Sequence, residues 1–88
     1  MTLRLRDDVS LTEGEDGGGV LLDERSGEYW QLNLSGFTTL RMGLADADEQ
    51  VIARALVPDG APTGVEQALL DVRELVEQLV SAGLVTRS

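Results

Sequence analysis

Residues 20–36 of the chain, VLLDERSGEYWQLNLSG, contain its only Trp and its only Tyr and decide how the rest folds. Two short apolar runs, 20–22 and 29–32, flank turn residues that end in Gly27. Apolar runs separated by a short glycine-containing turn are typical of a β-hairpin. We therefore expect the chain to be organised around a hairpin in this stretch.

The loop length fixes the register of this hairpin. A three-residue loop over 25–27, with Gly27 in the left-handed conformation, predicts three cross-strand pairs. These pairs are Glu24 with Glu28, Leu22 with Trp30, and Val20 with Leu32. The bulky apolar residues then share one face, Tyr29 and Gln31 point the other way, and a one-residue slip would set Asp23 beside the apolar side chains.

A helix is expected directly after the hairpin. Asn33 is a suitable N-cap, because its side-chain oxygen can accept a hydrogen bond from a free backbone N–H of the first turn. Phe37, Leu40 and Leu44 follow at helical spacing. The second strand of the hairpin and this helix are thus predicted to be nearly continuous in the chain.

Length and composition limit the possible functions. With 88 residues the chain is expected to be one domain, 1–88, with a modest core and no room for a deep catalytic cleft. It has no Cys and no His, which excludes disulfides, thiolate or histidine metal sites and the usual general base. We expect neither a metal nor another cofactor.

The formal net charge of −9 comes from 16 acidic residues against 7 Arg, without any Lys. Such a field repels nucleic-acid phosphates and anionic lipid, and it favours a basic or neutral partner. No apolar run is long enough to cross a bilayer, and the N-terminal residues lack the apolar core of a secretion signal. A cytoplasmic location, without nucleic acid or membrane as partner, is the expectation.

The segment before the hairpin reads as extended chain. Apolar and polar residues alternate over 3–6, which predicts a strand with Leu3 and Leu5 facing inward, and 9–11 predicts a second short extended piece. Residues 13–19, EGEDGGG, have the composition of a flexible loop. They do not resemble a phosphate-binding loop, because their neighbours are carboxylates and no Lys follows.

Two more helices are predicted after the first. Asp46 or Asp48 caps a second helix that Pro58 ends. Its apolar side is expected to consist of Val51, Ile52, Ala55 and Leu56. A third helix should run from about 64 to 82, beginning with a capping box of Thr63 and Glu66 and ending at Gly83. Residues 84–86 either form a last short strand or pack against the core.

The apolar stripe of the third helix is unusually wide. It comprises Val65, Ala68, Leu69, Val72, Leu75, Val76, Leu79, Val80 and Ala82. A helix packed on a small domain needs a stripe of roughly 100°, so one shoulder of this stripe is available to a partner, although each member is also compatible with ordinary core.

The order of elements predicts an α+β fold. It is compatible with a winged helix-turn-helix that has a small three-stranded antiparallel sheet in the N-terminal half, followed by three helices. DNA binding is disfavoured, because the third helix carries only Arg73 among several carboxylates. The chain also shows no nucleophile in a recognisable catalytic setting, so we expect no enzyme activity.

Peptide capture remains as a function. If 28–32 is an edge strand, its unpaired backbone groups can accept an extended peptide as a further strand. Four or five such hydrogen bonds, each worth a net 0.5 to 1.5 kcal/mol, are largely offset by the ordering of a flexible peptide. An affinity of about 1 μM needs roughly 8 kcal/mol, so apolar pockets between this strand and the third helix must contribute.

A family resemblance agrees with this interpretation. Its motif consists of Gly27, Tyr29, Trp30, Leu32, Asn33, Ser35 and Gly36, and it extends to the closing Leu79, Gly83, Leu84 and Val85. The chain resembles the PqqD-like family, the small leader-peptide recognition modules (RiPP recognition elements) of modified-peptide biosynthesis. Within that family it is most similar to the standalone leader-binding proteins of lasso-peptide pathways. The resemblance implies the winged fold named above.

The resemblance also implies a site, in which the leader lies as an added strand in the groove between the third strand and the third helix. Carried onto this sequence, the site comprises Glu28, Tyr29, Trp30, Gln31, Leu32, Asp71, Val72, Leu75, Val76 and Leu79. Arg73 or Asp71 would hold polar groups of the leader at the rim. Lasso leaders carry a Tyr followed three positions later by Pro, which implies an aromatic slot. Trp30, Leu32, Val72 and Leu79 are equally compatible with the core.

The predicted function is therefore a non-catalytic module that captures a lasso-peptide leader and delivers it to a separate leader peptidase and cyclase. One alternative is a PqqD-type peptide carrier in a radical-SAM pathway. Another is a winged-helix protein-protein adaptor that binds no leader. The loop 13–19 is either a contact for a partner or a flexible insertion.

Overall fold

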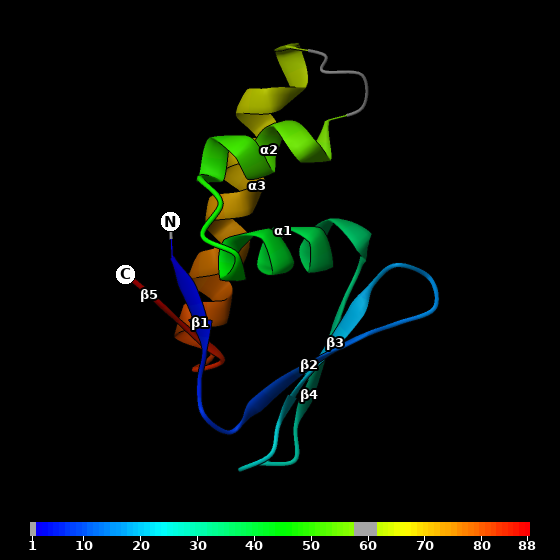
Figure 1. Ribbon diagram of the computed structural model, residues 1–88, viewed down its shortest axis with the longest axis vertical. Helices are drawn as coiled ribbons and strands as arrows, with labels where there is room; N and C mark the ends of the chain where they lie inside the picture. Colours follow the sequence, from blue (N-terminus) through cyan, green and yellow to red (C-terminus); the bar gives the residue numbers. More distant parts are fainter. Residues whose placement is uncertain (1, 58–61) are drawn as a thin grey trace.

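A computed structural model describes residues 2–57 and 62–88 of the chain (Figure 1). The elements, in order, are β1 Leu3–Leu5, β2 Val9–Glu13, β3 Gly19–Asp23, β4 Tyr29–Leu32, α1 Leu34–Leu44, α2 Glu49–Leu56, α3 Pro62–Ser81 and β5 Val85–Arg87. This order confirms the α+β prediction, with a small antiparallel sheet followed by three helices in the described part.

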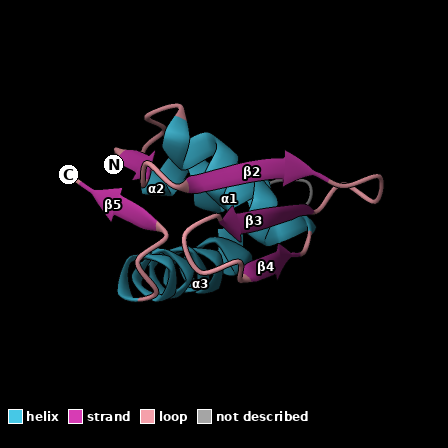
Figure 2. Ribbon diagram, turned by 90° about the horizontal axis from the view of Figure 1, so that it is seen from below, coloured by secondary structure: helices cyan, strands magenta, loops and turns pink. Residues whose placement is uncertain are grey.

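The strands form two antiparallel sheets rather than one. The first is the predicted three-stranded sheet, in the order β2-β3-β4, and the second pairs β1 with β5 across the whole length of the chain. Residues at the C-terminal end therefore do return as a strand. Figure 2 shows the three-stranded sheet from below, with the helices behind it and α3 next to β4.

The register of the hairpin differs from the prediction by one residue. Leu21 lies opposite Trp30, and Leu22 lies opposite Tyr29. The loop has four residues, 24–27, and is closed by a hydrogen bond of 2.9 Å from the Asp23 N–H to the Glu28 carbonyl. Gly27 has the predicted left-handed conformation, with φ of 78°. The predicted three-residue loop and its pairs were wrong.

Packing against α1 explains the observed register. Gly19 faces Phe37 so closely that a Cβ on Gly19 would clash with the ring. Leu21 on the same face is completely buried, whereas Leu22 is 36% exposed. Asp23 therefore lies on the inner side after all, and its carboxylate accepts a hydrogen bond of 3.0 Å from the Arg25 N–H. That local bond removes the polar conflict that had argued against this pairing.

The glycine-rich segment is a tight turn between two strands and not a long flexible loop. Its first and last residues, Glu13 and Gly19, belong to β2 and β3. The Gly14 N–H donates to the Gly18 carbonyl at 2.8 Å, and the Asp16 carboxylate accepts from the Gly18 N–H at 3.0 Å. The turn thus connects the two strands directly.

The predicted caps of the first two helices are confirmed. The Asn33 side chain accepts a hydrogen bond of 2.8 Å from the Gly36 N–H, and Asp48 caps α2 by accepting from Gln50. The apolar side of α2 was predicted incompletely: its buried residues are Ile52 and Ala53, whereas Val51 and Ala55 are exposed. Pro58, the predicted stop, lies outside the described residues.

Helix α3 begins at Pro62, two residues before the predicted start, and ends at Ser81. Thr63 is therefore inside the helix and not its N-cap. Gly83 follows the helix with φ of 77°, as expected of a glycine that ends a helix. The Leu84 N–H then donates back to the Leu79 carbonyl at 3.0 Å and turns the chain into β5.

The core lies between the sheets and the helices. It consists of Leu3, Val9, Leu21, Leu32, Phe37, Leu40, Ile52, Val72, Val76, Leu79, Leu84 and Val85. Leu3 faces inward as predicted, and Leu5 packs against the same core. Within 2–57 and 62–88, no helix has the length and apolar composition needed to cross a membrane.

Candidate functional site

Among residues 2–57 and 62–88, no strand pairs with one side of β4, because it is the last strand in the order β2-β3-β4. The Asp23 N–H donates to the Glu28 carbonyl, which is one of the two bonds of a hydrogen-bonded pair. In an antiparallel sheet such pairs recur at every second residue, so Trp30 and Leu32 also direct their backbone groups toward β3. Tyr29 and Gln31 consequently present their N–H and C=O groups at the free edge.

Two hollows lie along α3, one of them beside β4 and the other beside Asn33, which follows β4. The first, here called the helix hollow, has a volume of about 560 Å³ and is lined by Asn33, Ser35, Gly36, Thr39, Leu56, Val57, Gly64, Gln67, Ala68, Asp71, Val72 and Leu75. The second, the hairpin hollow, has a volume of about 480 Å³ and is lined by Asp23, Glu28, Trp30, Gln78, Ser81, Ala82 and Leu84.

One face of α3 connects the two hollows. Asp71 and Leu75 line the helix hollow, and Gln78 and Ala82 continue the same face into the hairpin hollow at spacings of three and four residues. On the opposite side, β4 contributes Trp30 to the hairpin hollow, and the residue that follows β4 lines the helix hollow. Both hollows thus follow α3, one beside Trp30 of β4 and the other beside Asn33, which comes directly after β4; the two hollows together are called the groove below.

The side chains of β4 divide between its two faces. Trp30 lies on the inner face, remains 42% exposed and lines the hairpin hollow, whereas Leu32 on the same face is buried in the core. Tyr29 lies on the outer face and is 72% exposed. A half-exposed Trp beside an open hollow supplies a large apolar contact surface for a ligand.

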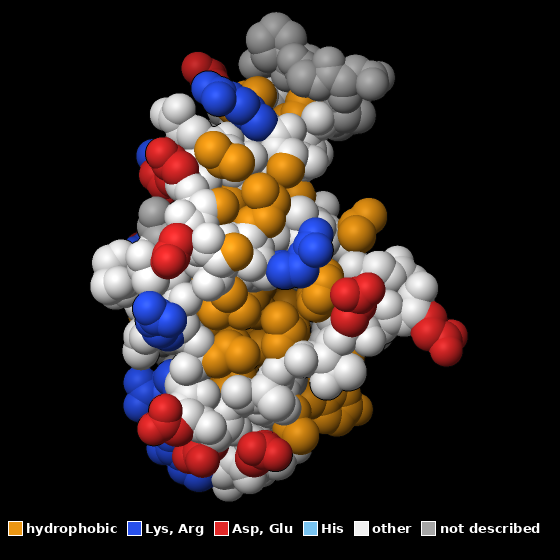
Figure 3. Space-filling view, in the orientation of Figure 1, with side chains coloured by type: hydrophobic (Ala, Val, Ile, Leu, Met, Phe, Trp, Pro, Cys, Tyr) orange, Lys and Arg blue, Asp and Glu red, His pale blue; other side chains and the backbone are white. Residues whose placement is uncertain are grey.

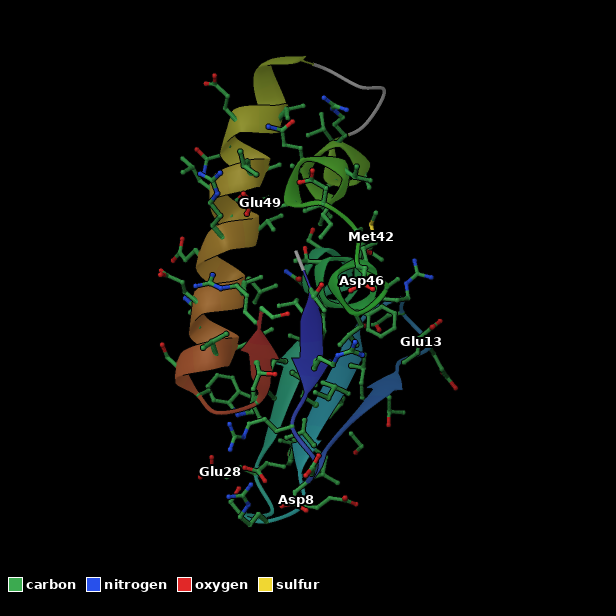
Figure 4. The ribbon with its side chains drawn as sticks, turned by 60° about the vertical axis from the view of Figure 1, so that its left-hand side comes forward. Asp8, Glu13, Glu28, Met42, Asp46 and Glu49 are labelled. Atoms are coloured by element: carbon green, nitrogen blue, oxygen red, sulfur yellow. The ribbon has the colours of Figure 1, made fainter. Side chains whose placement is uncertain are left out.

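The structure brings only part of the predicted site into the groove. Glu28, Trp30, Asp71, Val72 and Leu75 line one of the two hollows. Figure 4 shows Glu28 near the hairpin end of the sheet. Tyr29 and Gln31 contribute backbone groups at the edge, while their side chains lie on the outer face.

The remaining predicted residues have other surroundings. Val76 and Leu79 are buried in the core and line neither hollow. Arg73 lies outside both hollows and forms an ion pair of 2.9 Å with Glu49 of α2, the residue labelled beside α3 in Figure 4. The hydrogen bond and charge of Glu49 raise the pKa of Arg73. Of the two residues predicted at the rim, only Asp71 lines the groove.

Small and polar residues make up much of the groove that the sequence did not reveal. They are Ser35, Gly36 and Thr39 on α1, Gln67, Gln78 and Ser81 on α3, and Ala82 directly after α3. The α3 members follow the helical spacing from Asp71 and Leu75, so extending that spacing along the edge of the apolar stripe would have identified them. Of the α1 members, Ser35 and Gly36 belong to the family motif, whereas Thr39 carries no comparable signal.

The charge of the groove is negative. Asp23 and Glu28 line the hairpin hollow and Asp71 lines the helix hollow, and Arg lines neither of them. Arg6 and Arg25 lie beyond Asp23 in a neighbouring depression. Within the described residues, no cluster of three or more acidic side chains is arranged to hold a metal ion. The groove can therefore bind an extended, uncharged or basic segment through backbone groups and apolar contacts.

Comparisons with known proteins agree with this geometry. The family model of coenzyme PQQ synthesis protein D (PqqD) matches residues 18–85. The structure is similar to that of lasso peptide synthetase B1 complexed with the leader peptide, with a TM-score of 0.81 and 30% identity over 99% of this chain and 100% of the other. It also has the fold of TbiB1 in complex with the TbiA(beta) leader peptide, with a TM-score of 0.74 and 19% identity over 100% and 98% of the two chains. A search of curated proteins returned no match.

Proposed function

The chain belongs to the PqqD family, and from this we propose that it is a non-catalytic module that captures the leader of a lasso-type precursor peptide. The leader would add to β4 as a fourth strand of the sheet and lie in the groove against α3. The unpaired edge of β4, with the hairpin hollow beside Trp30 and the helix hollow beside Asn33, is the observation that carries this proposal.

The sequence of β4 supports its use as a binding edge. Soluble proteins usually protect such edges with charged residues, Pro or a covering element. β4 reads Tyr-Trp-Gln-Leu and carries none of these side chains. An uncharged edge strand that stays unprotected in a soluble protein is expected to have a partner, and an extended peptide satisfies its backbone groups completely.

The two hollows supply the affinity that backbone hydrogen bonds lack. Burial of one large apolar side chain contributes about 1.5 to 3 kcal/mol. One such anchor in each hollow contributes about 3 to 6 kcal/mol toward the roughly 8 kcal/mol that a micromolar complex requires, so further apolar contacts are needed beside the backbone bonds at Tyr29 and Gln31. We propose Trp30 and Leu75 as apolar contacts and Asp71 and Glu28 as polar contacts at the rim; Val72 lines the helix hollow but is itself buried in the core.

Capture of the leader is expected to serve separate enzymes of the pathway. We propose that the bound leader is presented to a leader peptidase and a cyclase of the same pathway, because the chain offers binding surface and no catalytic setting of its own. The similarity to lasso peptide synthetase B1, at 30% identity over nearly the whole chain, favours this pathway over a PqqD-type carrier in a radical-SAM pathway. The alternative of a winged-helix adaptor that binds no leader does not account for the unpaired edge of β4.

A fluorescence-anisotropy titration tests the proposal. The probes are fluorescein-labelled TbiA(beta) leader and the leader of the lasso peptide synthetase B1 complex, each with and without replacement of its Tyr residues by Ala. We expect micromolar binding of at least one leader that weakens in the substituted peptide. Absence of binding by both leaders at tens of micromolar would refute a lasso-type leader module.

A further inference from the structure

The outer face of the three-stranded sheet has an unusual composition. Its strand positions, which follow from the register, are Ser10, Thr12, Val20, Leu22, Tyr29 and Gln31. None is charged, although charged residues make up 26% of the chain. Figure 3 shows hydrophobic side chains at the surface over the lower end of this sheet.

Three of these residues form an apolar ledge at the β4 side of the face. Leu22 and Tyr29 lie directly opposite one another, and Val20 is their neighbour along β3. Leu22 is 36% exposed and Tyr29 is 72% exposed. This outer ledge, made of Val20, Leu22 and Tyr29, lies on the opposite side of the sheet from the groove.

A strand added to β4 would extend both faces of the sheet at once. Side chains of a strand alternate between the two faces, so every second residue of the added peptide enters the groove and the residues between them join the outer face. Tyr29 directs its backbone groups to the free edge, so the peptide residue paired with it lies on the side of the Tyr29 ring. Directly paired side chains in a sheet lie within contact distance.

We propose that the outer ledge is a second recognition surface for the captured peptide, and that it takes an apolar side chain of the residue paired with Tyr29. The inference rests on the proposed function, because it needs the peptide to add to β4. The ledge is continuous with that edge and is uncharged in a chain of net charge −9, so an apolar residue fits it better than a charged one. Side chains on both faces of the added peptide would thus contact the protein, one set in the groove and the other on the outer ledge.

The test measures binding of the two leaders named above by the wild-type chain and by Tyr29→Ser. Because the Tyr29 side chain is largely exposed, the variant is expected to keep its fold, which urea unfolding checks. We expect its affinity to fall about two- to fivefold, the factor expected of one cross-strand aromatic pair. The matched control is Leu70→Ser, which also removes an exposed apolar side chain and lies outside both hollows.

An alanine scan of the leader locates the paired residue. At one peptide position, substitution by alanine should weaken binding to the wild-type chain but not to Tyr29→Ser. At a different position, it should weaken binding to the wild-type chain but not to Leu75→Ala, a variant of the groove. Because side chains alternate between the two faces, the residue numbers of these two peptide positions must differ by an odd number.

The outcomes distinguish this inference from the proposed function. If wild type binds a leader and Tyr29→Ser binds it equally well, the ledge is not a recognition surface while the proposed function stands. The inference would also be overturned if the peptide positions whose alanine effect disappears in the two variants had residue numbers that differ by an even number. Absence of binding by the wild type refutes the proposed function, and the inference with it.

Discussion

Gln31→Pro tests whether a peptide adds to the free edge of β4. Gln31 directs its backbone N–H away from β3, so proline at this position removes a donor that the sheet does not use. Pro also favours an extended conformation of the residue before it, which suits Trp30 within a strand. The variant should therefore fold and lose part of its binding edge.

The expected loss of affinity follows from the hydrogen bonds involved. An added strand would form two bonds with Gln31, one to its N–H and one to its carbonyl. The proline ring abolishes the first and pushes the strand away from the second. At a net 0.5 to 1.5 kcal/mol each, the two bonds correspond to about 1 to 3 kcal/mol, or roughly a 5- to 150-fold weaker complex.

The assay is the same anisotropy titration, with two controls that separate backbone from side chain. Gln31→Ala changes the side chain and keeps the N–H, so its affinity should stay close to that of the wild type. Trp30→Pro removes a hydrogen bond between β3 and β4 and should lower the melting temperature, unlike Gln31→Pro. A folded Gln31→Pro that binds the leader as tightly as Gln31→Ala would refute strand addition at β4.

Three further variants test the groove and the packing that positions it. Leu75→Asp places a carboxylate in the helix hollow and should weaken leader binding at least tenfold with the fold retained by circular dichroism; loss of folding would instead assign Leu75 to the core. Gly19→Ala forces a methyl group against Phe37 and should destabilise the chain by about 1 to 3 kcal/mol in urea unfolding, and an unchanged midpoint would contradict the close approach of α1. Asn33→Ala removes the cap of α1 and should cost about 1 kcal/mol in the same experiment, whereas Asn33→Asp should retain most of the stability.

Local signals in the sequence were sufficient to predict the elements but not their exact pairing. Asn33 was predicted as a cap, and the cap of α2 was narrowed to Asp46 or Asp48, because capping depends on the residue type and its position before an apolar run. The hairpin register depends on contacts between distant residues. Leu21 and Leu22 are chemically identical, and only the approach of Phe37 to Gly19 decides which of them enters the core.

The groove residues were likewise predicted where a local pattern marks them and missed where a contact with another element decides their position. Leu75 and Asp71 were predicted and line it, because they lie at the edge of the apolar stripe of α3. Val76 and Leu79 belong to the same stripe but lie nearer its centre, and the core buries them. Arg73 could be placed only with the structure, since its partner Glu49 is on another helix. A helical wheel gives the face of one helix and contains no information on the element packed against it.

The pairing of β1 with β5 has a consequence for the exchange of backbone amide hydrogens. Terminal segments of most domains fray and exchange their amides rapidly. Here the Arg6 N–H donates to the Leu84 carbonyl and the Ser88 N–H donates to the Thr2 carbonyl. Both segments also cover core residues, so those of their amides that bond across the two strands should exchange slowly, through unfolding of the whole structure. Removal of the last few residues would open the first strand as well, and the two extremities of the chain thus protect one another.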